Sequence, residues 1–219
     1  MARLKKYTHV KHLFSLSLYV FCVKNSSSMP IDKTTMQTLL VKDKINYTGA
    51  ELSSHFAYRR FDLSGDSLVA FCGACSVGLD EMVDLADVKD NAPIYSENML
   101  HFIAEFFGGD LEKTVLRQRL LISIIKDEIA LLSGSDFVRR GDDIYDGEGK
   151  LSVSIATASP VSCMIHTGIN ISSKNTPVKT AALDDYGIDA YAFAQKVLSS
   201  FSDEISDIHH ARCKVRGVK

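Results

Sequence analysis

Two stretches of alternating apolar and polar residues, joined to a glycine-containing turn, constrain the fold of this chain more than any other feature. From Lys150 to Thr157 every second side chain up to Ile155 is apolar, and a second alternating stretch follows Pro160. A period of two places successive side chains on opposite faces of a strand. The turn at residues 146–149 contains the glycines that a tight hairpin needs. Residues 139–172 therefore predict a hairpin that leads into two strands of a sheet.

The alternation also predicts which side chains share a face of the sheet. In the first stretch the polar side chains are Lys150, Ser152 and Ser154, and the apolar ones are Leu151, Val153 and Ile155. In the second stretch the polar side carries Ser162, His166, Gly168, Asn170 and Ser172. If the strands pair with their polar sides together, Lys150, His166 and Asn170 line a common surface. The simpler alternative is that Lys150 faces solvent, as most lysines do.

The same residues resemble the core of the biotin and lipoate protein ligases. The chain has Gly141-Asp142-Asp143-Ile144, a turn, Lys150 followed by small residues, and a strand ending in Gly168-Ile169-Asn170-Ile171. The ligases carry Asn-Asp-Ile or Asn-Asp-Leu, a hairpin, an essential lysine and a strand ending in Gly-Ile-Asn-Val. The segment from Thr176 to Ile205 is similar to the part of the ligases that follows. The resemblance implies an α+β fold with a mixed, mainly antiparallel central sheet flanked by helices.

A closer resemblance runs through nearly the whole chain after Met29. It is to an uncharacterised, largely archaeal family called domain of unknown function 366. The segments that carry it are Leu63–Cys75, Ile94–Phe107, Leu116–Lys126, Gly141–Thr157 and Ser159–Ile171. The fold of that family is placed with the class II aminoacyl-tRNA synthetases and biotin synthetases. The resemblance implies this fold and brings no assigned reaction.

We expect residues 29–219 to form a single domain and residues 1–28 to be an extension outside it. A chain of 219 residues with 46% apolar content can bury one core. Residues 1–28 begin with basic residues and continue into an apolar run from Leu13 to Val23, as signal peptides do. That run is too short to span a bilayer, and no small-x-small cleavage site follows it. We favour a start of translation assigned too early, with Met29 as the true start.

The distribution of charge argues against nucleic acid as a partner. The formal net charge is −2, but residues 1–28 hold five lysines and arginines and no acid. The remainder has 20 basic and 27 acidic side chains, a net charge of −7. Nucleic-acid binding relies on a basic surface that neutralises phosphates. We expect neither a DNA partner nor a membrane partner. The sequence is compatible with a homodimer and with a monomer.

Cys72-Gly73-Ala74-Cys75 has the C-x-x-C spacing of some zinc and redox sites. A structural zinc site needs a second pair of ligands, and the sequence has none at matching spacing. We therefore interpret both cysteines as small buried residues at the end of a strand from Ser67 to Phe71, and we expect no metal ligands. Reduced thiols suit a cytoplasmic location.

Periodicity predicts several further elements. Leu111–Leu132 has apolar residues at helical spacing, Ala190–Ile205 is a last helix, and Ala211–Val218 alternates as a strand. Tyr95–Phe107 is ambiguous, because its periodicity favours a helix and the ligase resemblance favours a strand. In the acidic stretch Leu79–Val88, Asp80, Glu81, Asp84 and Asp87 resemble a carboxylate cluster, but we interpret the stretch as the solvated face of a helix or loop.

If the resemblance extends to chemistry, the reaction is activation of a carboxylic acid by ATP and Mg²⁺. Carboxylates are poor electrophiles, and the charge that develops on the α-phosphate during adenylation needs a fixed cation. The resemblance to the ligases implies this role for Lys150, and His166 is the second catalytic candidate. Asp142 and Asp143 would organise the loop and hold Mg²⁺ through water. The remaining substrate-binding candidates are Arg140, Ser152, Gly168, Asn170 and His101, the last weighed as an acid-base partner of Glu105.

The chain departs from the ligases in its first half. They carry a glycine-rich loop, Gly-Arg-Gly-Arg in the biotin type, and it is absent here. The octanoyltransferases of the same fold, which Lys150–Asn170 also resembles, hold the acyl group on a cysteine in a later loop, and Asn175–Lys179 has none. We expect a ligase or acyltransferase for a small carboxylic acid, centred on Lys150. The alternative is a non-catalytic module that binds a metabolite or a protein.

Overall fold

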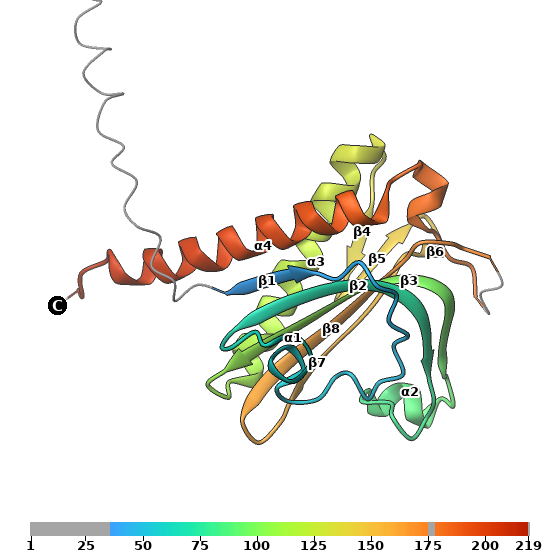
Figure 1. The fold of residues 1–219 in the computed structure, drawn as a ribbon. Coiled ribbons are helices and arrows are strands. Elements are labelled where there is room, and N and C mark those ends of the chain that lie inside the picture. The colour runs from blue at the N-terminus through green and yellow to red at the C-terminus, as the bar shows by residue number, and fades with distance from the viewer. Residues whose placement is uncertain (1–35, 175–177, 219) are drawn as a thin grey trace, which may run out of the picture. The chain divides into compact units, whose positions relative to one another are not determined.

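A five-stranded sheet is the centre of the structure (Figure 1). The computed structural model describes residues 36–174 and 178–218, and the expected extension at residues 1–28 lies outside them. In spatial order the strands are β1 (Gln37–Leu40), β2 (Ser67–Val77), β3 (Ile94–Phe107), β8 (Ser162–Asn170) and β7 (Ser152–Ala158). β1 runs parallel to β2, and all the other neighbours in this sheet are antiparallel. The predicted α+β fold with a mixed, mainly antiparallel sheet is confirmed.

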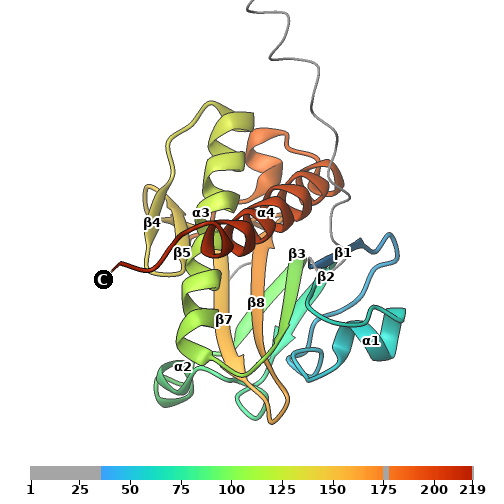
Figure 2. The same cartoon turned by 90° about the vertical axis from the view of Figure 1, so that its left-hand side faces the viewer.

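Two long helices cover one face of this sheet. Figure 2 shows α3 (Leu111–Ser133) and α4 (Ala190–Cys213) crossing on the same side of the strands. The side chain of Asp110 caps the first turn of α3, and Gly134 takes the left-handed conformation that ends it. The core between helices and sheet contains Leu68, Phe102, Phe106, Leu121, Ile125, Ile165, Phe193 and Phe201.

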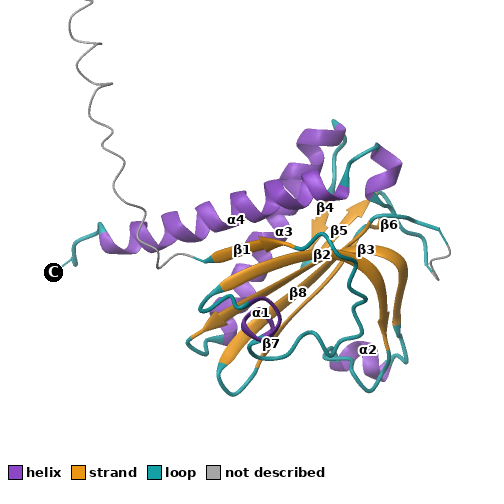
Figure 3. Ribbon diagram, viewed as in Figure 1, coloured by secondary structure: helices purple, strands orange, loops and turns teal. Residues whose placement is uncertain are grey.

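Shorter elements cover the opposite face. Figure 3 shows α1 (Phe56–Phe61) and α2 (Leu85–Lys89) on the side away from the long helices. The core on this side contains Tyr47, Phe56, Val69, Phe71, Met99, Ile103 and Met164. The buried carboxylate of Glu105 connects three elements, because its Oε1 accepts hydrogen bonds of 2.7 Å from His55 N before α1 and from Ser162 Oγ on β8.

A small second sheet leads into the large one. Its strands are β4 (Val138–Arg140), β5 (Asp143–Asp146) and β6 (Gly149–Lys150). A two-residue loop with Gly147 at φ 55° joins β5 to β6, which confirms the predicted hairpin. The predicted continuous strand from Lys150 is interrupted at Leu151, which is fully buried and lies between β6 and β7 without being part of either strand. The chain changes sheets at this residue.

The observed elements test four predictions made from the sequence. Residues 94–107 form a strand, because successive side chains enter the cores on its two faces, and the helix that periodicity favoured is wrong. The helices predicted at 111–132 and 190–205 are confirmed. The strand predicted at 211–218 is wrong, because α4 continues to Cys213 and residues 214–218 form neither helix nor strand. A short 3₁₀ helix, Leu183–Tyr186, precedes α4.

The two cysteines of the C-x-x-C motif face opposite sides of β2. Cys72 packs in the core under the long helices, and Cys75 packs with Tyr47 in the other core. Both thiols are free and buried. Their interpretation as small core residues is confirmed, and β2 extends past them to Val77.

Gly73 on β2 allows a close approach of backbone. A Cβ at this position would lie 2.0 Å from the carbonyl oxygen of Ile45, which is a backbone atom. We expect Gly73→Ala to lower the free energy of unfolding by about 1–3 kcal/mol, the usual cost of overpacking, in urea denaturation. Gly78→Ala is the matched control, since nothing lies within 4 Å of a Cβ there. Equal stability of the two variants would contradict this account.

Candidate functional site

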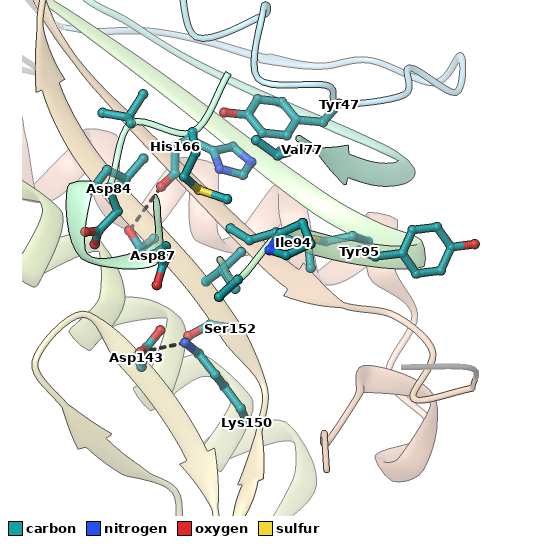
Figure 4. Close-up of a pocket in the computed structure, with 18 of the residues that line it drawn as sticks. Tyr47, Val77, Asp84, Asp87, Ile94, Tyr95, Asp143, Lys150, Ser152 and His166 are labelled. Atoms are coloured by element: carbon teal, nitrogen blue, oxygen red, sulfur yellow. Dashed lines mark hydrogen bonds and ion pairs between the residues drawn. The ribbon is translucent and has the colours of Figure 1, made fainter. Parts of the chain in front are cut away.

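A cavity of about 360 Å³ lies on the sheet face opposite the long helices. Its described walls come from five regions: the segment before α1, the connection from β2 through α2 to β3, the β5-β6 hairpin, the paired strands β7 and β8, and residues 178–180 after β8. Figure 4 shows His166 and Tyr47 at one end of the lining and Lys150 with Asp143 at the other. The cavity therefore brings together residues that lie more than 100 positions apart in the sequence.

Lys150 is held at its end of the cavity by an ion pair. Its Nζ lies 2.9 Å from Oδ2 of Asp143, and the exposed fractions of the two side chains are 35% and 22%. Burial lowers the pKa of Lys150, but the hydrogen bond and charge of Asp143 outweigh it and leave the pKa above its ordinary value. Lys150 is thus a fixed cation. It is the one lysine or arginine among the described residues that line the cavity.

Asp142 faces a different set of partners from Asp143. Its carboxylate lies 2.8 Å from Nη1 of Arg119 and accepts a 3.0 Å hydrogen bond from Nε2 of Gln118, both on α3. The same amide of Gln118 also donates to Ser154 Oγ on β7. Asp142 therefore fastens the hairpin to the helix, although it also contributes to the cavity wall.

Ser152 and Asn170 hold backbone in place at the change of sheets. The hydroxyl of Ser152 accepts a 2.8 Å hydrogen bond from Ile144 N. Nδ2 of Asn170 donates to the carbonyl oxygens of Lys150 and Ala181, at 3.1 and 3.3 Å. Both residues line the cavity, and these contacts position the backbone that carries Lys150.

The expected faces of β7 are exchanged. Val153 pairs with Gly168 and Ile155 pairs with His166, so these apolar residues share the face that lines the cavity. Ser154 pairs with Thr167 and reaches α3 through Gln118. The expectation that Val153 and Ile155 share the face of Leu151 is wrong. The interruption at Leu151 shifts the alternation by one residue, and for this reason Lys150 and Val153 can face the same space.

His166 lines the cavity and His101 lies behind it. His101 is 0% exposed and His166 is 4% exposed. Their rings are joined by a 3.1 Å contact between Nδ1 of His101 and Nε2 of His166, and Tyr47 stacks on His166 with ring centroids 3.7 Å apart. Burial lowers the pKa of His101 to about 4 and lowers the pKa of His166 as well. Both imidazoles are therefore neutral at pH 7.

Three candidates lie outside the described lining of the cavity. His101 contacts His166 rather than Glu105, whose Oε1 is bound by His55 and Ser162. Arg140 is exposed, with its guanidinium 4.9 Å from the ring centroid of Tyr145. Gly168 makes room for Met99, because a Cβ there would lie 2.3 Å from the Met99 sulfur. Met99 in turn lines the cavity.

The sequence prediction missed the acidic wall of the cavity. Glu81, Asp84 and Asp87, from the stretch interpreted as a solvated face, line it together with Asp142 and Asp143. Asp84 also caps α2 by accepting from Ala86 N at 2.8 Å. Burial and the neighbouring Asp84 raise the pKa of Asp87. The only signal in the sequence was the density of acids, which a solvated helix shares.

Two absences hold for the described residues. Within 36–174 and 178–218, no group of three or more His, Cys, Asp or Glu side chains is arranged to hold a metal ion. Among the helices of the same residues, none is both long and apolar enough to cross a membrane.

The buried histidines predict acid sensitivity. Unfolded histidines have pKa values near 6.5, so between about pH 6.5 and 4 the unfolded chain binds more protons than the folded one. Stability should fall as the pH decreases through this window, with His101 contributing on the order of 3 kcal/mol. Urea denaturation at several pH values measures this slope. The slope should be smaller in His101→Phe, and an unchanged slope would contradict the assignment.

Comparisons with known proteins agree with this fold. The uncharacterised protein MJ0805 of Methanocaldococcus jannaschii is 39% identical over 184 residues, covering 81% of this chain and 83% of that protein. A solved structure of a protein of unknown function from Pyrococcus horikoshi has a TM-score of 0.80 and 38% identity, covering 84% of this chain and 100% of the other.

More distant structures share the fold alone. The biotin protein ligase from Aquifex aeolicus, in complex with biotin and ATP, has a TM-score of 0.53 at 15% identity, covering 78% of this chain and 72% of the ligase chain. The predicted likeness to the ligase fold is confirmed. The family model described as domain of unknown function (DUF366) matches residues 36–216, and this chain belongs to that family.

Proposed function

We propose that the cavity binds a small carboxylic acid and that the protein activates it with ATP, as a ligase that forms an acyl-adenylate. The observation that carries the proposal is the ammonium group of Lys150, fixed by Asp143 at one end of a cavity whose opposite end is apolar and aromatic. An acid with an apolar body fits this distribution. The ligase fold supports the proposal at the level of architecture.

The step requires a cation that is in place before charge develops. A carboxylate oxygen of the substrate attacks the α-phosphorus of ATP, a P–O bond forms, and the bond to the β-phosphate breaks to release pyrophosphate. Lys150 would stabilise the negative charge on the α-phosphate and the acid oxygen. Because the side chain is already ordered and partly buried, it loses little freedom at that moment. Asp143 is its positioning partner.

The residues present fit a magnesium ion that arrives with the nucleotide. The described residues hold no preformed metal cluster, but Mg²⁺ bound to phosphates needs only one or two protein carboxylates. Asp142 is occupied by Arg119 and Gln118. Asp143 and Asp87 are better placed, since both interact electrostatically with Lys150 from the cavity wall. Magnesium bound there would offset their charge beside the triphosphate.

Transfer through a thioester has less support. Cys75 and Cys163 are buried, and neither is among the described residues that line the cavity. Burial and the charge of Glu51 raise the pKa of Cys75 to about 12, so its thiolate is scarce at pH 7. An adenylate is therefore the activated acid that we propose.

A non-catalytic binding module is the second candidate. It is favoured by the charge of the described lining, in which five carboxylates stand against a single lysine, because this surplus repels a triphosphate without bound metal. Such a module would bind its ligand through Lys150 without turnover. The two candidates differ in the effect of removing Lys150, which changes only affinity in a binding module.

Pyrophosphate exchange tests the ligase. The protein is incubated with ATP, Mg²⁺ and a panel of octanoate, lipoate and biotin, and exchange of labelled pyrophosphate into ATP is measured. We expect exchange with at least one acid, and about a 10²–10³-fold loss of its rate in Lys150→Ala, since a charge-stabilising donor is removed. Exchange with no acid would contradict adenylation.

A nearby lysine provides the matched control for that loss. Lys179 is 71% exposed, and its ion pair with Glu148 lies on the surface. Lys179→Ala should exchange at nearly the wild-type rate, because exposed ion pairs contribute little. An equal loss in both variants would assign the effect to general positive charge and not to Lys150.

A further inference from the structure

Three polar groups form a chain that ends at the cavity. Nε2 of His101 lies 3.4 Å from the carbonyl oxygen of Gly73, and Nδ1 of His101 lies 3.1 Å from Nε2 of His166. A carbonyl oxygen can only accept a hydrogen bond. Neutral His101 is therefore protonated on Nε2, and its Nδ1 carries a lone pair that can accept a hydrogen bond. The hydrogen bond to the carbonyl oxygen of Gly73 thus fixes the tautomer of His101.

The tautomer of His166 is fixed in the same way. Its Nε2 must donate to the lone pair of His101, so in a neutral ring Nδ1 of His166 carries no proton. Among the described residues no protein group hydrogen-bonds to this atom, while the ring lines the cavity. The environment keeps His166 neutral, because the ring is buried and faces His101. The cavity is left with one oriented acceptor at this end.

The surroundings of this acceptor are apolar. Tyr47 stacks on the His166 ring with an interplanar angle of 7°. Val77 and Ile94 line the cavity nearer to this end than Lys150, which lies at the other end (Figure 4). Met99 is a further apolar residue of the lining. A ligand that reaches both ends must satisfy an unprotonated nitrogen in low-dielectric surroundings, where an unmade hydrogen bond is costly.

We propose that Nδ1 of His166 accepts a hydrogen bond from a neutral N–H or O–H group of the ligand, with His101 as the positioning residue that fixes its tautomer. Together with the carboxylate site at Lys150, on which the full substrate class depends, this selects an acid with an apolar body and an amide, urea or hydroxyl donor at the far end. A plain fatty acid leaves the acceptor unpaired. The donor requirement itself does not depend on Lys150.

Nitrogen NMR tests the proposal without any reaction. Protein labelled with ¹⁵N-histidine at pH 7 should show His166 with its proton on Nε2 and a lone pair on Nδ1. The probes are 2-pyrrolidinone, which has one ring N–H, and N-methyl-2-pyrrolidinone, which lacks it. We expect only the first to shift the Nδ1 resonance of His166 in the direction of hydrogen-bond acceptance. A protonated Nδ1, equal shifts with both probes, or no shift with either would overturn the proposal.

Variants of His101 separate positioning from packing. His101→Gln keeps an acceptor for His166 and a donor for Gly73, so it should retain the selective shift. His101→Phe keeps the ring volume and removes the relay, so His166 should populate both tautomers and the selective shift should weaken. Equal behaviour of the two variants would overturn the role of His101.

Lys150→Ala separates this inference from the proposed function. The response of His166 to 2-pyrrolidinone should persist in this variant, because the probe has no carboxylate. Loss of this response in Lys150→Ala would contradict the inference that His166 accepts a hydrogen bond independently of Lys150. Failure of pyrophosphate exchange with a retained response would count against adenylation alone.

Discussion

The site depends on the interruption of strand pairing at Leu151. Leu151 is fully buried, its N–H bonds to Ile144 O on β5, and its carbonyl oxygen accepts from Asn170 N on β8. One residue therefore belongs by hydrogen bonding to both sheets. Without this shift, the alternation would direct Lys150 away from the face that Val153 and Ile155 line. The change of sheets at this buried residue thus allows Lys150 to face the cavity.

Much of the fold could be predicted because local pattern and burial agree. The helix at 111–132 has one apolar stripe and clear limits, and the structure confirms it. Periodicity failed for β3, since Phe102 and Ile103 are both buried, on opposite faces, and a strand covered on both sides loses its alternation. It failed again after α4, where a basic alternating sequence has no neighbouring strand to pair with among the described residues.

The site was predictable only along the hairpin and β8. Lys150, His166 and Asn170 line one cavity because the chain brings them together over 21 residues. The acids of the α2 region and Tyr47 come from distant segments, and no local pattern signals that they meet. His101 was singled out with the wrong partner. Its contact with His166 follows from the pairing of β3 with β8. The sequence alone does not give the register of that pairing.

The two ends of the cavity impose different requirements on a ligand. Lys150 favours a negative group, the surplus of carboxylates demands compensation by a cation such as magnesium, and His166 offers an acceptor among apolar residues. A crystal structure of the protein with ATP, Mg²⁺ and an exchanging acid tests the central claim most directly. We expect an anionic oxygen of the ligand about 2.7–2.9 Å from Nζ of Lys150. A ligand bound elsewhere, with Lys150 still paired only to Asp143, would contradict it.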